Sequence, residues 1–302
     1  MAIWTPEPGE TLLARDAIAF ATGTAPRVPG MRWFRDTQRN DIQGELPGWP
    51  SGPVFSAHPE AEKHPGKRAG LFGMRALYVA IGGALESLGG TGSFLPGAGD
   101  GPGRPEEPEN EVSDFPVMWA DAGTLARTLP WQLDPARCPE GFRTHIIVTD
   151  RRVVITSFPD GDPLRDQVLW QVDRSQIARV RRMGFSSVGG EAKVQFTDGS
   201  WIRLAPPGSR KYWSVLRHLV HPADVVPLDA LTKRQREYVE SYVASVNERD
   251  TSVEPVITRR PSGKFLIEVP TTKPVKPDLG MLRPFWFMSQ AGGHGGFDPK
   301  DL

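Results

Sequence analysis

The chain has 302 residues, a formal net charge of +0 and 24% charged residues. A neutral balance gives no overall attraction to a polyanion, so we expect no nucleic-acid partner. Hydrophobic residues make up 38%, enough for a core, but 32 glycines and 30 prolines predict many loops. The lone cysteine, Cys138, excludes an intrachain disulfide and suits a reducing compartment. Residues 1–7 have no leader pattern and no stretch predicts a membrane span. We therefore expect a cytoplasmic protein, with peripheral association at the inner membrane face as an addition.

The N-terminal third of the chain predicts little regular structure. The alanines of residues 11–21 favour a helix. Residues 22–66 are interrupted repeatedly by proline and glycine, which predicts irregular chain. Within it, Trp33, Phe34 and Trp49 are expected to anchor the chain by burial against a core.

Residues 67–88 have apolar side chains at helical spacing and basic residues at their start. One interpretation is a buried helix that packs closely through its glycines. The other is an interfacial helix on an anionic membrane or a partner, with Leu71, Leu77 and Arg75 as contacts.

Residues 91–114 are rich in glycine, proline and glutamate, and they predict a flexible acidic linker. The acidic residues at 106–121 have two interpretations. They keep the loop in solution, or they fold back as a flap over the arginines of the following basic segment. Residues 117–119 and 131–133 predict short docking segments.

Residues 141–220 carry the clearest pattern of secondary structure. Runs rich in β-branched residues predict strands at 143–149, 153–158, 167–172, 177–183, 192–197 and 200–204. Asp198-Gly199 between the last two is a strong hairpin signal. Ser209 is a good N-cap for an amphipathic helix that ends near Val220.

This segment resembles bacterial PH-like and GRAM-like domains. The resemblance rests on Thr149-Asp150-Arg151-Arg152 in the first hairpin, on the stretch from Trp170 to Ile177, and on the terminal helix. Gly9, Glu10 and Leu13 also look like the segment that precedes the first strand in those families, which makes residues 8–21 a strand instead of a helix. The resemblance implies an α+β fold in which a helix caps a curled antiparallel sheet or barrel. It also implies a binding or adaptor function for lipid headgroups or protein partners.

The predicted organisation is a PH-like domain at 8–222, interrupted at 22–140 by the insertion. A helix-plus-hairpin extension follows at 223–270, where Thr232 and Gln235 form a capping box. Residues 271–302 predict an extended tail. Its apolar cluster at 282–288 docks on its own domain or binds a partner, and we favour docking.

No nucleophile, carboxylate pair or nucleotide loop has the spacing that catalysis requires, so we expect no enzyme, no cofactor and no small-molecule substrate. His218 and His221 have metal-ligand spacing on a helix, but no third ligand lies nearby in the sequence, so no metal is expected. Arginine recognises phosphate well. The leading prediction is therefore a non-enzymatic PH-like adaptor that binds an anionic lipid headgroup or a protein partner, with Arg151, Arg152, Arg181 and Arg182 as the headgroup site. The alternative is an assembly protein that contacts its partner through Phe285, Trp286, Phe287 and residues 67–88.

Overall fold

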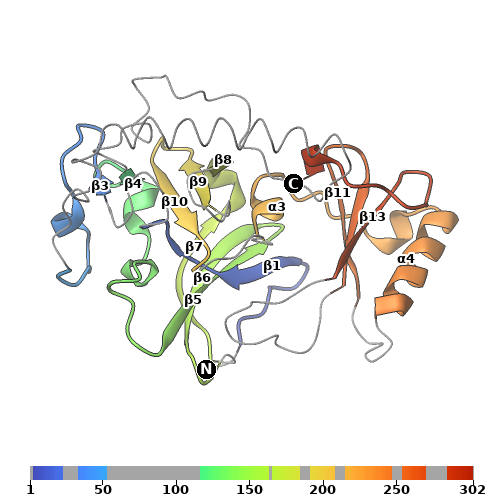
Figure 1. Cartoon of the computed structure of the whole chain (residues 1–302), viewed down its shortest axis with the longest axis horizontal. Coiled ribbons are helices and arrows are strands. Elements are labelled where there is room, and N and C mark those ends of the chain that lie inside the picture. Colours follow the sequence, from blue (N-terminus) through green and yellow to red (C-terminus); the bar gives the residue numbers. More distant parts are fainter. Residues whose placement is uncertain are drawn as a thin grey trace, which may run out of the picture. The chain divides into compact units, whose positions relative to one another are not determined.

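The structure is a computed structural model that describes residues 3–22, 33–52, 116–162, 165–183, 191–207, 215–246, 254–269 and 284–301. The described part is mainly β-sheet with few helices, an α+β-like arrangement with three sheets that do not close (Figure 1). The predicted helix at 67–88 and the acidic linker at 91–114 lie outside the described residues. The chain divides into two compact units. Unit 1 contains Met1–Ala17, Glu140–Ser175 and Trp213–Leu302, and unit 2 contains Ile18–Pro139 and Gln176–Tyr212.

Sheet A of unit 1 is antiparallel, with strand order β1-β5-β6-β7. Its strands are β1 (Leu12–Ala17), β5 (Phe142–Thr149), β6 (Arg152–Pro159) and β7 (Gln167–Asp173). The strands predicted at 143–149, 153–158 and 167–172 are therefore confirmed. The helix considered for residues 11–21 is wrong over β1, because pairing with β5 outweighs the helix preference of alanine.

Sheet B belongs to unit 2 and has strand order β3-β4-β10-β9-β8, with β2 paired to β10. Its strands are β2 (Ala19–Phe20), β3 (Trp33–Arg35), β4 (Pro116–Trp119), β8 (Ile177–Met183), β9 (Glu191–Phe196) and β10 (Trp201–Ala205). The β9–β10 hairpin turns at Asp198-Gly199 as predicted. Gly199 has φ +86°, a conformation that glycine adopts without steric cost.

β3 lies in the stretch at 22–66 that was expected to be irregular, and β4 contains the segment at 117–119 that was expected to dock. β3 and β4 come from the predicted insertion and pair in parallel. They contain only three and four residues, too few for an alternating pattern to stand out. The anchoring role is confirmed for Phe34, which is fully buried, with its ring 5.1 Å from Trp49 and 5.6 Å from Phe20.

Sheet C of unit 1 is antiparallel, with strand order β11-β12-β13. Its strands are β11 (Val256–Arg259), β12 (Phe265–Glu268) and β13 (Phe285–Met288). The first two form the predicted hairpin. Docking of the apolar cluster is confirmed for β13, so the prediction of an extended tail is wrong there: burial of Phe287 and Met288 keeps this segment in the sheet.

The helices are short apart from one. The α-helices are α3 (Leu216–Leu219) and α4 (Lys233–Val246). The described 3₁₀ turns are Gln43–Glu45, Leu125–Thr128, Trp131–Leu133, Arg174–Gln176, Leu228–Ala230 and Pro299–Asp301. α4 begins as predicted: the Thr232 amide donates to Gln235 Oε1, and the Gln235 amide donates to Thr232 Oγ1. Only the end of the helix predicted from Ser209 is described, as α3.

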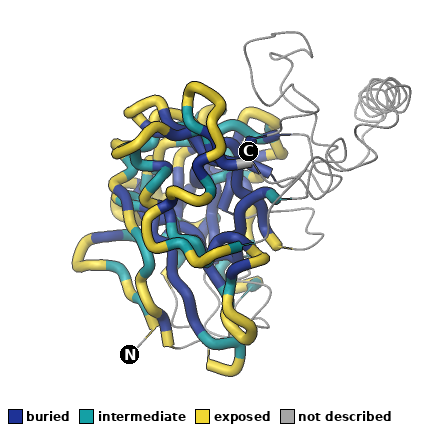
Figure 2. The backbone as a smooth tube through the Cα atoms, turned by 90° about the vertical axis from the view of Figure 1, so that its left-hand side faces the viewer, coloured by how far each residue is buried: buried dark blue, intermediate teal, exposed yellow. Residues whose placement is uncertain are grey.

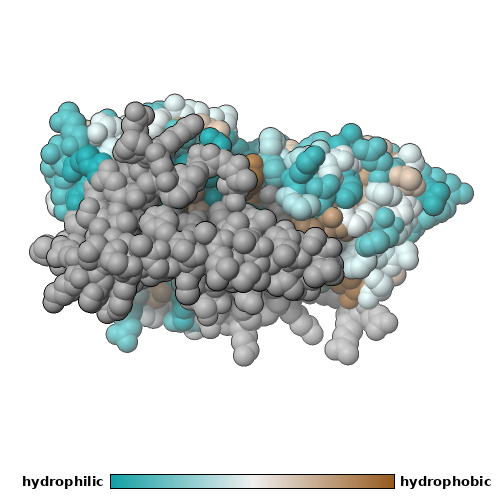
Figure 3. Space-filling view, turned by 45° about the horizontal axis from the view of Figure 1, so that its top comes forward, coloured by the Kyte–Doolittle hydropathy of each residue, from teal (hydrophilic) through white to brown (hydrophobic). Residues whose placement is uncertain are grey.

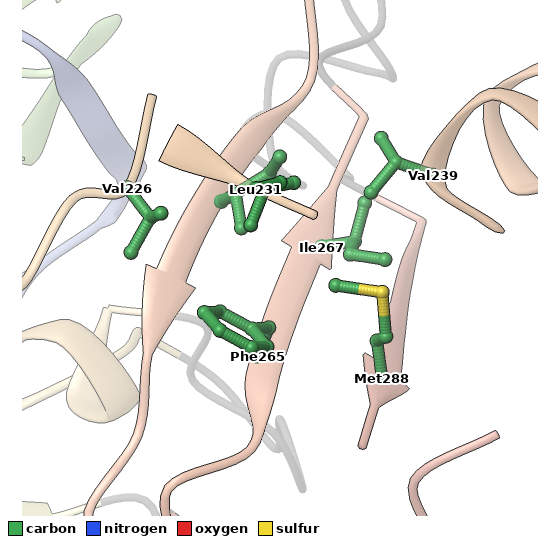
Figure 4. Packing of buried hydrophobic residues seen from close by; sticks show 7 residues of the cluster. Val226, Leu231, Val239, Phe265, Ile267 and Met288 are labelled. Atoms are coloured by element: carbon green, nitrogen blue, oxygen red, sulfur yellow. The ribbon is translucent and has the colours of Figure 1, made fainter. Parts of the chain in front are cut away.

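Burial follows the strands, and exposure is concentrated in the turns (Figure 2). One face of sheet C has its own small core, in which Phe265, Ile267 and Met288 meet Val239 of α4 (Figure 4). Tyr238, Tyr242 and Val243 pack against it, as the predicted apolar stripe of α4 requires.

Candidate functional site

The hairpin between β5 and β6 contains the first pair of predicted anion-binding arginines. The Glu10 carboxylate accepts hydrogen bonds from Arg152 Nε and Nη2, both at 2.9 Å, and from Thr149 Oγ1 at 2.6 Å. Arg152 Nη2 also lies 2.9 Å from Glu7 Oε1. The guanidinium of Arg152 is thus bound by two carboxylates of its own chain, and binding of an external anion by this residue stays a prediction.

The pKa shifts of Glu10 and Arg152 agree with the hydrogen bonds between them. Burial alone would raise the pKa of Glu10, but hydrogen bonds from Arg152 and Thr149 outweigh it and lower the pKa below its ordinary value. The hydrogen bond to Glu10 raises the pKa of Arg152. Both groups are therefore charged at neutral pH.

Arg151 and Asp150 of the same hairpin also form hydrogen bonds with the segment before β1. Arg151 is exposed, and its Nη2 donates to the Gly9 carbonyl at 2.6 Å. Asp150 Oδ1 accepts a hydrogen bond from the Thr11 amide at 2.8 Å. Residues 9–11, just before β1, are thus hydrogen-bonded to the hairpin at 149–152, and this set of contacts is called the latch below.

The second predicted pair lies in unit 2. Arg181 and Arg182 are half-buried on β8. Burial lowers the pKa of Arg181, and the positive charge of Arg203 lowers it further. The structure therefore places the four predicted arginines as one pair in each unit. Arg75, Leu71 and Leu77 lie outside the described residues.

Sheet C presents exposed aromatic side chains, which are unusual on a surface. On the face drawn in Figure 3 the described residues are mainly hydrophilic. Phe285 and Trp286 of β13 are 42% and 44% exposed, and Phe297, which follows β13 in the chain, is 53% exposed. The third predicted contact residue, Phe287, is 6% exposed. Phe285, Trp286 and Phe297 are called the aromatic surface below.

The aromatic surface is held in place from both faces of β13. On one side, Trp286 Nε1 donates to Tyr238 Oη at 2.8 Å and its ring stacks on Tyr242. Burial, and then the charge of Glu268, raise the pKa of Tyr242 to about 12, so this hydroxyl stays protonated. On the other side, the Arg217 guanidinium lies 4.2 Å from the centre of the Phe285 ring.

Next to this surface lies a buried charged cluster that the sequence did not predict. His218 Nε2 lies 2.7 Å from Glu268 Oε2, and Arg217 Nη1 lies 3.8 Å from Glu268 Oε1. Burial lowers the pKa of His218, although Glu268 acts in the opposite direction. His218 is therefore a neutral, structurally paired histidine at pH 7.

Arg260 closes the cluster by donating to the main-chain carbonyls of Arg217 and Asp301. The described residues contain no group of three or more side chains that could bind a metal. His218 and His221 therefore have no third metal ligand beside them in that part of the chain. The partner of His218 is fifty residues further along the chain, and no local pattern could have indicated it.

Comparison with known proteins found no matching family model, no matching curated protein and no matching solved structure. Among the described helices, none combines the length and apolar composition needed to cross a bilayer.

Proposed function

We propose that this chain is a non-enzymatic PH-like binding module whose ligand is a protein partner. The observation that carries the proposal is the aromatic surface: Phe285 and Trp286 at the start of β13, and Phe297 in the segment that follows it, remain 42%, 44% and 53% exposed. Large exposed aromatic residues are enriched in protein interfaces, where they bury much area at a small entropic cost.

The order of elements supports the PH-like part of the proposal. β1, β5, β6 and β7 form one antiparallel sheet, and β8, β9 and β10 follow in the chain as a second antiparallel set. A helical segment, α3, comes next. This is the succession that the resemblance implied, with the Glu10–Arg152 latch joining its two recognised segments.

The choice of a protein over a lipid headgroup rests on the state of the arginines. Arg152 is neutralised by Glu10 and Glu7, and Arg151 donates to a main-chain carbonyl. By contrast, Phe285 and Phe297 retain about half of their surface. The Arg217 guanidinium stacks on Phe285 and also lies 3.8 Å from Glu268, so the exposed contact area is chiefly apolar and favours a partner with apolar groups.

A photoreactive phenylalanine at position 297 tests this proposal in cells that express the full chain. We expect covalent products with a small, reproducible set of proteins. The same substitution at Phe142, which is 42% exposed on β5, serves as the matched control and should not give them. A second substitution, Phe285→Gln, should abolish the products at 297.

The same chain should then be mixed with vesicles of neutral or anionic lipid at low and moderate salt. Salt-sensitive binding to anionic vesicles alone, lost in Arg151→Gln and with no protein products at 297, would overturn the partner proposal in favour of a headgroup. Identical products at 297 and 142 would also overturn it, because the aromatic surface would then have no selectivity.

A further inference from the structure

Sheet C has two edge strands, β11 and β13, on either side of β12 (Figure 4). The outer side of β11 is covered by the chain itself. The Val226 amide donates to the Ile257 carbonyl at 2.8 Å, and the Arg259 amide donates to the Asp224 carbonyl at 2.8 Å. An uncovered edge presents main-chain donors and acceptors with which another chain can pair. The outer side of β13 therefore decides whether sheet C can accept a further strand.

The register between β12 and β13 determines which main-chain groups of β13 point outward. The Val269 amide donates to the Pro284 carbonyl at 3.0 Å, so these opposite residues form a hydrogen-bonded pair. The next pair along the ladder is Glu268 with Phe285. Hydrogen-bonded and non-hydrogen-bonded pairs alternate in an antiparallel ladder. The N–H and C=O groups of Phe285 therefore point away from β12.

The second half of this outer side is occupied by the chain itself. The Gly295 amide donates to the Phe287 carbonyl at 2.8 Å, and Met288 forms an antiparallel bridge with His294. Phe287 lies two residues after Phe285, so its outward carbonyl agrees with the alternation of the ladder. A Cβ on Gly295 would lie 2.8 Å from the main-chain carbon of Met288, a distance that only glycine avoids. This edge thus accepts an extended segment at close range.

After this bridge the chain leaves the edge of β13. The Gly296 carbonyl accepts a hydrogen bond from Lys264 Nζ at 2.7 Å, and Asp301 Oδ1 accepts from the Ser262 amide at 3.0 Å. Both contacts lie at the turn between β11 and β12. The outward N–H and C=O groups of Phe285 have no hydrogen-bond partner among the described residues, and Phe285 is half-exposed. This position of β13 is called the open edge below.

Aromatic rings flank the open edge on both faces of the sheet. On one face, the Phe287 ring lies 6.1 Å from the Phe285 ring and 6.1 Å from the Phe297 ring. On the other face, the Trp286 ring stacks on Tyr242. Successive side chains of a strand point to opposite faces. A strand beside Phe285 would therefore bring its alternate side chains against aromatic rings on each face.

The charged groups next to the open edge lie close to each other. The Arg217 guanidinium, 4.2 Å from the centre of the Phe285 ring, lies 3.8 Å from the Glu268 carboxylate. Each offsets the charge of the other. A charged side chain placed against the rings would lose water without gaining a counter-charge there, whereas an apolar one would gain from burial.

We propose that the protein partner contributes an extended segment with uncharged, mainly apolar side chains, and that the main chain of this segment pairs with Phe285 at the open edge. This inference rests on the proposed function and specifies how the partner binds. The outward donor and acceptor of Phe285 favour an extended main chain, because one residue of such a chain supplies both complementary groups. The aromatic rings favour apolar side chains at its alternate positions.

Hydrogen exchange of the unmodified full chain tests the open edge. We expect the Phe285 amide to exchange at a rate close to that of an unstructured peptide. The Trp286 amide, which points toward β12, is the internal control and should exchange at least about tenfold more slowly. Protection of the Phe285 amide in the chain alone would overturn the proposal, because the edge would already be covered. Protection that rises with protein concentration would also overturn it, by assigning the edge to a second copy.

The partner segment joined to the photoreactive residue at 297 provides the probe for the second test. A synthetic peptide of that sequence should bind the full chain and slow exchange of the Phe285 amide about tenfold. Two versions carry methyl groups on alternate main-chain nitrogens, one version for each edge of the peptide. The version methylated on the pairing edge should bind about tenfold more weakly, and the other version is the matched control.

The outcomes separate this inference from the proposed function. Covalent products at 297, combined with equal binding of the two methylated peptides, would overturn strand pairing and leave the partner proposal in place. Binding of the peptide without protection of the Phe285 amide would have the same meaning. Absence of covalent products at 297 would overturn both.

Discussion

At the scale of single residues, Glu10 connects the segment before β1 to the β5–β6 hairpin. Its carboxylate is the common acceptor for Thr149 and Arg152, which are more than 130 positions away in the chain. A carboxylate that accepts several charge-assisted hydrogen bonds is a strong local link. The residues of this hairpin therefore contribute to the assembly of sheet A.

Replacing Glu10 by glutamine should lower the free energy of unfolding by about 1–3 kcal/mol, since Arg152 keeps its charge but loses its nearest carboxylate. Denaturant unfolding measures this. Glu7→Gln is the matched control and should have a smaller effect, because Glu7 is largely exposed. Equal effects of the two variants would contradict the latch.

The Glu10 carboxylate should also make the free energy of unfolding depend on pH in the acidic range. The folded-state pKa of Glu10 is lower than its ordinary value of 4.5, so the unfolded state binds the proton first as pH falls. Its contribution is present above pH 4.5 and is lost as pH falls through the folded-state pKa. The Glu10→Gln variant should therefore approach the wild type in stability below that range, as acid titration of unfolding would show.

His218 should affect the free energy of unfolding at a higher pH than Glu10 does. Burial lowers its pKa below the ordinary 6.5; Glu268 opposes this, whereas Arg217 and Arg260 reinforce it. Below pH 6.5 the unfolded state binds a proton that the folded state resists, so stability should fall. His218→Gln should flatten this slope. His294→Gln controls for the loss of a histidine, and an unchanged slope in His218→Gln would contradict the assignment.

At the scale of elements, the small core of sheet C depends on β13. Met288 of β13 is fully buried between Phe265, Ile267 and the face that α4 covers (Figure 4). A helix and a two-stranded hairpin alone would leave these side chains in water. β13 is therefore part of the fold, and burial increases along it: Phe285 and Trp286 at its start remain half-exposed, while Phe287 and Met288 are buried.

Met288→Ala should destabilise the protein by about 2–5 kcal/mol through the cavity it leaves. Chemical unfolding followed by tryptophan fluorescence would report the change. Val168→Ala on β7 is a suitable control, because this side chain is 47% exposed and its truncation should cost little. A small effect of Met288→Ala would mean that β13 is not required for the core.

At the scale of the whole molecule, removing the C-terminal segment would not isolate a binding motif. Truncation before Pro284 would delete β13 and also Asp301, whose carboxylate holds Ser262 and whose carbonyl accepts from Arg260. We expect such a chain to bind hydrophobic dyes and to unfold sheet C. Point substitutions at Phe285 and Phe297 are the correct test of function, because they leave the core intact. Wild-type-like stability of the truncated chain would contradict this.

The sequence by itself determined the elements whose signal is local. The strands at 142–205 follow from runs of β-branched residues, the β9–β10 hairpin from Asp198-Gly199, and α4 from its capping box and apolar stripe. Each depends on residues only a few positions apart, so propensity and periodicity suffice.

Tertiary structure alone decided which partner each element takes. The alanine-rich residues 12–17 become a strand because β5 pairs with them. Residues 285–288, which were expected to lie in an extended tail, form β13 because they pair with β12. The pairs Glu10–Arg152 and His218–Glu268 determine which charges are satisfied within the chain. These contacts join residues 50 to 142 positions apart, and their energies depend on burial and distance, which no local pattern contains.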